Sequence, residues 1–335
     1  MPRVLITGVA GLLGSHLSEK FLYEGWEVRG IDSLIGGYIE NVPTSVDLHL
    51  LDLAALEEIS PCFEDVDLVV HAACTAYEGL SVFSPALIVQ NTLQITVSAL
   101  SAAISKKVKK FVFMSSMARY GTQETIPFTE DMVPNPQDPY GIAKYSAELL
   151  VKNLSITHEM DYCILVPHNI IGPKQKYNDP YRNVASIMIN RILQGKAPII
   201  YGDGEQMRCF SFISDVINPI FEACINQAAN SQTINIGPDE DTITINELAA
   251  RILKLMGANF APIYMPERPK EVKLASCSAD LSRKLLGYRT TKNLDDGLMD
   301  LITWIKASGV RKFEYHLPIE IQNTQTPRTW TEELM

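Results

Sequence analysis

A strand, a glycine-rich turn and a helix at the start of the chain constrain the fold more than any other feature. Residues 3–7 have the apolar pattern of a buried strand, and residues 12–23 have that of an amphipathic helix. Glycines at positions 8, 11 and 14 lie where the two segments join. Glycines at this spacing let the backbone turn sharply and approach a pyrophosphate, which then lies at the helix N-terminus. We therefore predict a dinucleotide site whose cofactor contacts include Gly8, Gly11, Leu12 and Leu13.

An acidic residue narrows the choice of dinucleotide. Asp32 ends the next predicted strand, 18 residues after Gly14. Its carboxylate can accept hydrogen bonds from a ribose 2′-hydroxyl and would repel a 2′-phosphate, which favours NAD over NADP. A purely structural glycine turn is the alternative, but the strand, the helix and the acid together favour NAD(H) binding.

Short apolar runs alternate with helix-like segments through the first half of the chain. This alternation predicts a parallel sheet covered on both faces, the Rossmann-type doubly wound α/β fold. The second half is less regular, and we expect a smaller C-terminal substrate lobe that interleaves with the first. The predicted organisation is a cofactor domain at 1–166 to which later strands contribute, a substrate lobe at 167–312 and an extended tail at 313–335 without an assigned role.

Composition excludes several classes of protein. The chain of 335 residues carries a net charge of −10, so phosphates of nucleic acid or of an anionic membrane would repel it. Its six cysteines form no C-x-x-C pair and no metal-ligand spacing, so we expect no metal site and a reduced, cytoplasmic protein. No uninterrupted apolar stretch of about 18 residues and no signal-peptide pattern is present, so no transmembrane helix is expected.

Two further strand ends are candidate cofactor contacts. Asp52 and Leu53 follow the third predicted strand, where an acid could face the adenine amino group; a solvated turn acid is the alternative. Ala72 and Ala73 follow the fourth strand, where small side chains would let a cofactor lie across the sheet edge. His71 before them fits a hydrogen-bonded core histidine equally well.

A tyrosine and a lysine one helical turn apart supply the candidate chemistry. Tyr140 and Lys144 share a helix face, and the lysine charge is expected to lower the pKa of the tyrosine and make it a usable base. Ser116 closes a predicted strand 24 residues before Tyr140, where its hydroxyl could bond the same substrate oxygen. A Tyr-x-x-x-Lys pair alone is common by chance, but beside the cofactor loop and the serine it is specific.

With these residues in place, the chain resembles an extended short-chain dehydrogenase/reductase of the nucleotide-sugar epimerase/dehydratase family, most closely its UDP-sugar 4-epimerases. The resemblance runs from Arg3 to about Trp304. Its main motifs are TGVAGLLG, VVHAA, Asn91, MSSMARYG, PYGIAK, PHNIIGP, IYGDGEQMR and FISDV.

The resemblance implies roles for matching positions. Tyr140 would be the base, Lys144 would tune it and bind the nicotinamide ribose, and Ser116 would complete a catalytic triad that contacts the sugar. Asn91 would contact the cofactor. The diphosphate and the rest of a UDP-sugar would be held by Asn169, Asn183, Arg208 and Arg268. Each of these four could instead be a turn residue or a surface ion-pair partner.

Departures from the family pattern limit the reaction and the sugar. Met117 and Ala118 follow Ser116 where 4,6-dehydratases have an acid pair, which argues against a dehydratase. Arg119 could face a C6 carboxylate of a uronic acid, although a solvated loop charge is favoured. Aligning on Ala279 and Asp280 places Cys277 at the family's sugar-pocket gate, where a small residue would leave room for a 2-acetamido group; a core thiol is the alternative.

These inferences together predict an NAD-dependent UDP-hexose 4-epimerase acting on UDP-GlcNAc/UDP-GalNAc or UDP-Glc/UDP-Gal. The alternatives are a UDP-uronic acid 4-epimerase or decarboxylase and another nucleotide-sugar oxidoreductase. A non-catalytic NAD(H) sensor is disfavoured because both Tyr140 and Lys144 are present. Family members commonly dimerise through two helices per subunit, so the segments 85–104 and 140–158 predict a homodimer.

Overall fold

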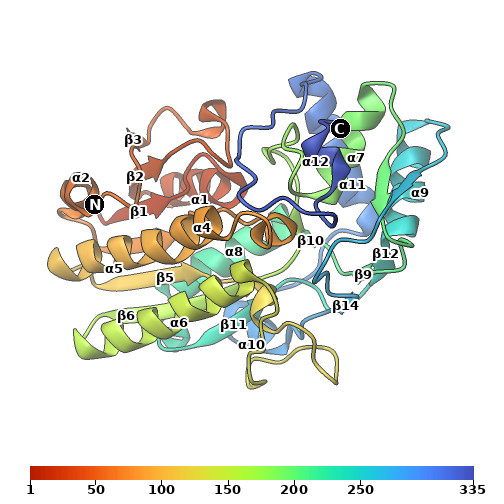
Figure 1. The fold of residues 1–335 in the computed structure, drawn as a ribbon. Coiled ribbons are helices and arrows are strands. Elements are labelled where there is room, and N and C mark those ends of the chain that lie inside the picture. The colour runs from red at the N-terminus through yellow and green to blue at the C-terminus, as the bar shows by residue number, and fades with distance from the viewer.

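Seven parallel strands form the central sheet of the protein, for which a computed structural model describes all 335 residues (Figure 1). The strand order is β11-β6-β5-β4-β1-β2-β3, and every neighbouring pair is parallel. This confirms the predicted Rossmann-type fold, whose order reverses between β1 and β4. The strands are β1 Arg3–Thr7, β2 Glu27–Asp32, β3 Asp47–Leu50, β4 Leu68–His71, β5 Lys110–Met114, β6 Asp161–Pro167 and β11 Thr233–Ile236.

Helices cover both faces of this sheet, as its all-buried central strands require. One face packs against α2, α5 and α6 and shares a core of 26 buried residues. The other face packs against α1, α8 and α10 around a core of 25 residues. The bounds are α1 Leu12–Tyr23, α2 Leu56–Ile59, α3 Glu78–Ser81, α4 Pro85–Val89, α5 Ile95–Ser105, α6 Pro139–Thr157, α8 Ile213–Ile225 and α10 Asp280–Leu286.

A smaller lobe has its own core of 21 buried residues, to which α7, α9 and α11 contribute. Local signals explain its best-defined helix: Thr244 and Glu247 form a capping box at the start of α9, and Gly257 ends it with φ of 63°. The lobe's elements are α7 Val184–Leu193, α9 Ile245–Met256, α11 Leu294–Ser308, β8 Ile199–Tyr201, β9 Met207–Arg208, β12 Ile243–Thr244, β13 Ile263–Met265 and β14 Leu274–Ala275. The short pair β7 Ile170–Ile171 and β10 Ser211–Phe212 joins it to the sheet layer. The domain boundaries predicted at 166 and 312 stay predictions.

The helical stretch Pro85–Ser105 is long and apolar enough, by composition, to cross a membrane. It is α4 and α5 joined by a π-helical turn, and its polar residues interrupt the apolar run that the sequence analysis required. Half of its most apolar window is buried, and it packs against α6 and β4. A core helix has this packing, so the stretch is weak evidence for a span.

The tail, residues 313–335, has no strand and one short helix, α12 Arg328–Thr331. Unlike a loose arm, it is packed against the body of the protein. Leu317, Trp330 and Met335 are all buried in it. In Figure 1 the dark blue chain leaves α11, passes beside α4 and returns to α12 next to α7.

Candidate active site

One cavity of about 550 Å³ runs along the carboxyl ends of the central strands and reaches into the smaller lobe. Sixteen of the eighteen residues predicted for the site line it; Lys144 and Cys277 do not. The strand ends explain this convergence, because β1, β2, β4, β5 and β6 all deliver their last residues to the same edge of a parallel sheet.

The glycine turn after β1 is shaped for close contact with a phosphate group. Gly8 has a φ of 71°, and a Cβ there would lie 2.8 Å from the backbone of Ala73. A Cβ on Gly14 would lie 2.1 Å from the carbonyl oxygen of Gly8. The N–H groups of Leu12 and Leu13, in the first turn of α1, find no acceptor within the protein and face the cavity. These free donors at a helix N-terminus fit the pyrophosphate of a dinucleotide.

Asp32 lies where a ribose would follow. Its carboxylate accepts hydrogen bonds from the N–H groups of Ala10 at 2.8 Å and Leu34 at 2.6 Å. Burial raises its pKa, and these backbone hydrogen bonds oppose that effect. Each oxygen accepts only one bond from the protein and keeps capacity for a ribose hydroxyl.

The other cofactor candidates lie along the same edge. Asp52 lines the cavity and also accepts the Ala54 N–H of its own turn at 2.9 Å, so its contact with adenine stays a prediction. Asn91 lies in the π-helical turn, and its side chain makes no bond to the protein. His71 is a core residue: Thr7 and Thr96 bond its two ring nitrogens, and burial, with the charge of Lys144, lowers its pKa to about 3.

Ser116 and Tyr140 meet at the centre of the cavity. The Ser116 hydroxyl accepts the Ala118 N–H at 3.2 Å, which leaves its own proton to donate to the Tyr140 oxygen. Asp138 caps α6 and fixes the helix start that presents Tyr140. Lys144 lies one turn deeper, 1% exposed, and donates to the Met114 carbonyl at 2.7 Å.

The environment of Tyr140 differs from the prediction. Burial raises the pKa of its hydroxyl well above the ordinary value, and the neighbouring Cys74 adds to this. The Ser116 hydrogen bond and the Arg182 charge lower it, whereas Lys144, with its ammonium group 6.0 Å from the ring centroid, is not a main influence. In this arrangement burial outweighs the effect predicted for the lysine, whose ammonium group bonds the Met114 carbonyl.

Two charged residues without an ion pair, Glu78 and Arg182, line the cavity near Tyr140, and no sequence motif pointed to them. Arg182 makes no ion pair; its guanidinium lies 5.8 Å from the Tyr77 ring centroid. Glu78, in α3, also has no ion pair; it is exposed to the open cavity, where desolvation by the surrounding protein together with Asp138 raises its pKa to about 7. Only tertiary structure brings them to Tyr140, since neither belongs to a motif or to a periodic apolar pattern.

Two predicted arginines share one counter-ion at the far end of the cavity. Arg268 contacts Glu271 at 3.0 Å and stacks on the Tyr201 ring at 4.7 Å. Arg208 lies 3.6 Å from the same carboxylate. Burial alone would raise the pKa of Glu271, but the two arginines hold it below its ordinary value. One carboxylate for two guanidinium groups leaves a net positive charge suited to a diphosphate.

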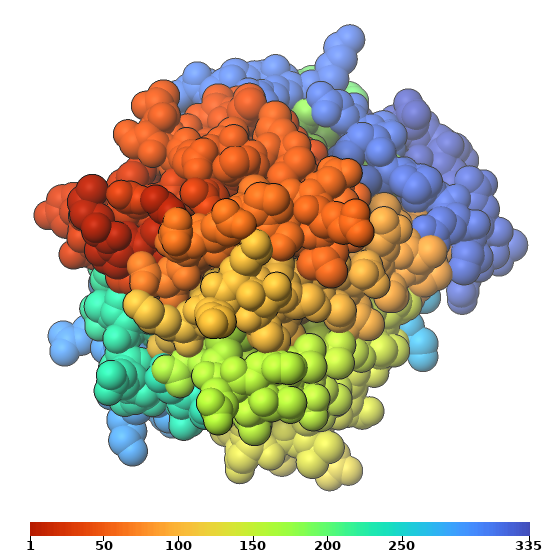
Figure 2. All heavy atoms as spheres, turned by 90° about the vertical axis from the view of Figure 1, so that its left-hand side faces the viewer, coloured from red at the N-terminus to blue at the C-terminus, as the bar shows by residue number.

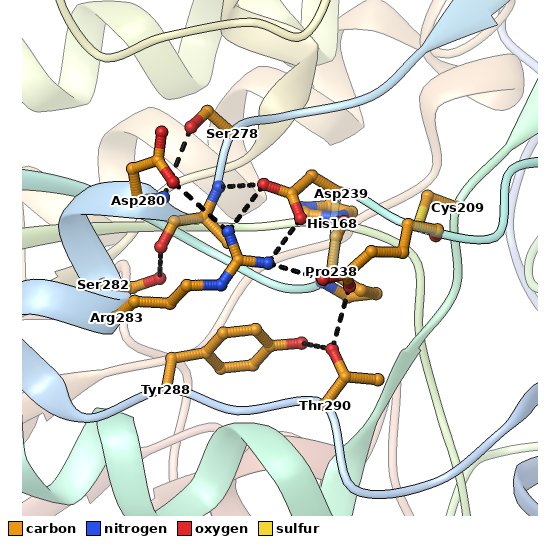
Figure 3. Close-up of polar contacts among 12 residues, drawn as sticks. His168, Cys209, Pro238, Asp239, Ser278, Asp280, Ser282, Arg283, Tyr288 and Thr290 are labelled. Carbon is orange, nitrogen blue, oxygen red and sulfur yellow. Dashed lines mark hydrogen bonds and ion pairs between the residues drawn. The ribbon is translucent and has the colours of Figure 1, made fainter.

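The two predicted asparagines line the cavity but are also structural. Asn183 caps α7 through Ser186 N–H at 3.5 Å, and Asn169 donates to the Cys209 carbonyl at 3.0 Å. Behind Asn169 lies a polar network: His168 bonds Pro238, and Arg283 pairs with Asp239 and Glu240 (Figure 3). This network connects α10 to the turn that carries Asn169 and so fixes the position of that turn.

Two predictions about the sugar pocket are wrong. Cys277 is fully buried in the core under Tyr120 and Phe128, so it cannot gate a pocket; Ala275 of the same segment lines the cavity instead. Arg119 neither faces the sugar nor lies in solvent. It is 3% exposed and pairs with Glu148, one turn beyond Lys144 on α6, at 3.1 Å. The sequence around Arg119 is loop-like and does not predict that Glu148 is its buried partner.

Comparisons with known proteins point to one family of enzymes. Residues 4–237 match the NAD dependent epimerase/dehydratase family. The UDP-glucose 4-epimerase of Mycolicibacterium smegmatis is 29% identical, over 91% of this chain and 98% of its own length. The relative is therefore matched almost completely, while part of this chain has no counterpart in it.

Solved structures give the same picture. A UDP-glucose 4-epimerase of Thermotoga maritima with UDP-glucose superposes with a TM-score of 0.85 at 28% identity, over 91% of this chain and 99% of that one. A UDP-glucuronic acid 4-epimerase of Bacillus cereus, in complex with UDP-glucuronic acid and NAD, has a TM-score of 0.84 at 27% identity, over 91% and 99%. These neighbours share the fold and differ in the sugar that their names state.

Proposed function

This chain belongs to the NAD-dependent epimerase/dehydratase family, and we propose that it converts a UDP-hexose into its C4 epimer through a 4-keto intermediate. The observation that carries this proposal is the position of Tyr140 and Ser116. They lie in one cavity between the glycine turn and the Arg208–Arg268 pair. A nucleotide sugar whose diphosphate lies on the arginines has its sugar directed toward the tyrosine.

The residues divide the chemistry among them. Tyr140 takes the proton of the sugar 4-hydroxyl and later returns it, and Ser116 bonds the same oxygen and steadies the phenolate. NAD, which the glycine turn and Asp32 would hold, would supply a reversible hydride acceptor for C4 and a positively charged ring that favours the phenolate. The arginines hold the diphosphate while the keto sugar turns, so that its other face is presented. Met117 and Ala118 offer no acid or base, which argues against loss of water.

Equilibration of the purified protein with UDP-GlcNAc, UDP-Glc and UDP-GlcA tests the proposal. We expect a C4 epimer from at least one of them, identified by proton NMR, with no net formation of NADH because the cofactor is restored in each turnover. Absence of a C4 epimer from all three would refute it. Net NADH formation or release of CO₂ would indicate an oxidoreductase or a decarboxylase instead.

A uronic acid substrate is the second candidate, and Arg182 favours it. Its unpaired guanidinium faces the cavity beside Tyr140, and a guanidinium binds a carboxylate through paired hydrogen bonds. A C6 carboxylate would therefore gain a partner that a C6 hydroxyl does not need. Arg182→Ala should then reduce turnover of UDP-GlcA far more than that of UDP-Glc, and Arg182→Lys should restore part of it. Equal losses for both sugars would remove this candidate.

We also propose that the protein is a cytoplasmic homodimer that binds neither nucleic acid nor membrane. Ile142, Leu149 and Ile156 form an exposed apolar stripe along α6, each separated by seven residues. The neighbouring helix adds Val89, and α5 and α6 lie side by side on one face (Figure 2). An apolar stripe on two adjacent helices fits a helical interface between two copies. Light scattering should give twice the chain mass, and Leu149→Glu should give the monomer.

A further inference from the structure

The tail joins the two walls of the cavity. On the sheet side it bonds the segment that follows α3: Ser84 donates to Pro318 O at 2.7 Å, and Ile321 N–H donates to Phe83 O at 2.8 Å. The Glu320 carboxylate accepts the first free N–H groups of α4, at 2.9 and 2.8 Å. An acid at a helix N-terminus satisfies donors that the helix itself leaves free.

On the opposite side the same tail bonds the loop that carries Arg182. Trp330 Nε1 donates to Pro180 O at 3.1 Å, and Tyr181 Oη donates to Leu317 O at 3.2 Å. Glu314 N–H donates to Asn178 O at 2.9 Å. Beyond this loop, Arg191 and Lys196 of the smaller lobe donate to the carbonyls of Leu334 and Met335, at 2.8 and 2.6 Å.

A separate hydrophobic cluster connects the tail to the catalytic residue. Leu317 and Trp330 share it with Tyr140. Trp330 lies between the two walls, with its ring centroid 6.0 Å from that of Phe83 and 5.6 Å from that of Tyr181. Met335 of the tail lines the cavity itself. The full membership is Tyr77, Leu80, Phe83, Ile88, Ala118, Tyr140, Tyr181, Leu317 and Trp330.

We propose that the tail is a retention strap: by holding both walls against Trp330, it keeps the 4-keto sugar in the cavity until the hydride has returned to C4. This proposal rests on the proposed epimerase function. Retention matters because the intermediate is bound only by non-covalent contacts and must turn within the cavity, which requires space. A wall that opened during that turn would release the ketone.

The cost of release follows from the balance of the first half-reaction. The 4-hydroxyl loses a proton to Tyr140 and C4 loses a hydride to NAD⁺, giving a ketone and NADH. If the ketone leaves, the proton passes to solvent and the protein keeps NADH, which cannot oxidise the next substrate. Each ketone lost therefore inactivates one active site until NAD⁺ replaces NADH, so strap failure has a signature distinct from slow catalysis.

The test compares Trp330→Ala with the unmodified protein and with Trp26→Ala. Trp26 is a matched control because it packs on Phe21, away from the cavity and the tail. For Trp330→Ala we expect epimer formation that slows with time and NADH that accumulates on the protein. Free 4-keto sugar, trapped by reduction with borodeuteride, should rise at least about tenfold per epimer formed, an effect of about 1.4 kcal/mol on the partition. NAD bound before substrate is added should be unchanged.

A milder variant keeps the proposal testable if Trp330→Ala does not fold. Ser84→Ala combined with Glu320→Gln weakens the hold of the tail on the sheet-side wall without removing an aromatic ring, and should give a rise in NADH and trapped ketone that is smaller because the Ile321–Phe83 backbone bond remains. Linear progress curves without NADH or ketone in both variants would overturn the strap while leaving the epimerase proposal intact. No epimer from the unmodified protein would refute both proposals.

Discussion

The cofactor half of the cavity and its sugar half are built in different ways. The cofactor half uses backbone: the free N–H groups of Leu12 and Leu13 and two glycines that leave no room for a Cβ. The sugar half uses side chains from distant segments, among them Glu78, Tyr140 and Arg182. Backbone geometry is fixed by a short run of sequence, whereas side chains can change without refolding the chain. Substitutions in the glycine turn should therefore abolish cofactor binding or leave it intact. Substitutions in the sugar half should instead reduce turnover or substrate affinity by different amounts.

Tyr140→Phe is expected to give the largest difference between the effect on turnover and the effect on NAD binding. The ring keeps its place in the cluster, but the base is lost, so turnover should fall by roughly 10²- to 10⁴-fold. Bound NAD, measured after denaturing the purified protein, should stay at the level of the unmodified chain. Tyr145→Phe is the matched control, because Tyr145 lies on the same helix outside the cavity. Unchanged turnover in Tyr140→Phe would exclude it as the base.

Gly14→Ala attacks the backbone half. A Cβ at 2.1 Å from the Gly8 carbonyl must displace the turn, at a cost of roughly 1–3 kcal/mol typical of overpacking. We expect loss of bound NAD and a lower melting temperature. Gly25→Ala serves as a control for glycine loss, since nothing lies within 4 Å of its Cβ position, although its φ of 81° adds local strain. Retention of NAD by Gly14→Ala would contradict the assigned role of the turn.

Arg268→Ala attacks the sugar half at its diphosphate end. Loss of a charge-assisted hydrogen bond of roughly 1.5–3 kcal/mol corresponds to about a 10- to 100-fold rise in KM for the nucleotide sugar. The Glu271 carboxylate, left with Arg208 alone, would add repulsion. Bound NAD should not change. Arg251→Ala, which removes a surface pair with Asp295, is the control and should leave KM unchanged.

The sequence predicted the cofactor half better than the sugar half, because the cofactor half is built from neighbouring residues and the sugar half from distant ones. Strand, turn, helix and Asp32 follow one another closely along the chain, so their spacing alone predicted a cofactor site that the structure places at the cavity. The Tyr140–Lys144 pair was also local, because the two residues share a helix face, whereas Ser116 lies 24 residues earlier and could be added only through its place at a predicted strand end. Glu78 and Arg182 were missed because nothing nearby in sequence places them beside Tyr140. Cys277 and Arg119 were misplaced because neither the spacing from Ala279 and Asp280 nor a loop-like segment reveals which side chains face the core.

The pH dependence of substrate binding sharpens the role of Glu78. Its pKa of about 7 means that the carboxyl is neutral below pH 7 and negative above it. A negative charge near the Arg208–Arg268 pair opposes a diphosphate, so KM should rise as pH increases through about 7, by up to roughly tenfold. The negative charges of Asp138 and Glu271 raise the pKa of Glu78 further, whereas the positive charges of Arg208 and Arg268 lower it. In Glu78→Gln the KM should be nearly flat between pH 6 and 8; an unaltered rise would assign it to another group.

The smallest effect on substrate choice is expected from substitution of Cys277, which the sequence wrongly placed at the gate of the sugar pocket. Cys277→Ala should cost about 1 kcal/mol of stability, as a small core truncation, and leave the ratio of UDP-GlcNAc to UDP-Glc turnover unchanged, because Cys277 does not reach the cavity. Ala275→Val narrows the cavity from the same segment and should lower that ratio, since the 2-acetamido group is the bulkier substituent. A ratio that responds to Cys277→Ala and not to Ala275→Val would restore the gate to position 277. The sugar half would then be more predictable from sequence than its scattered residues imply.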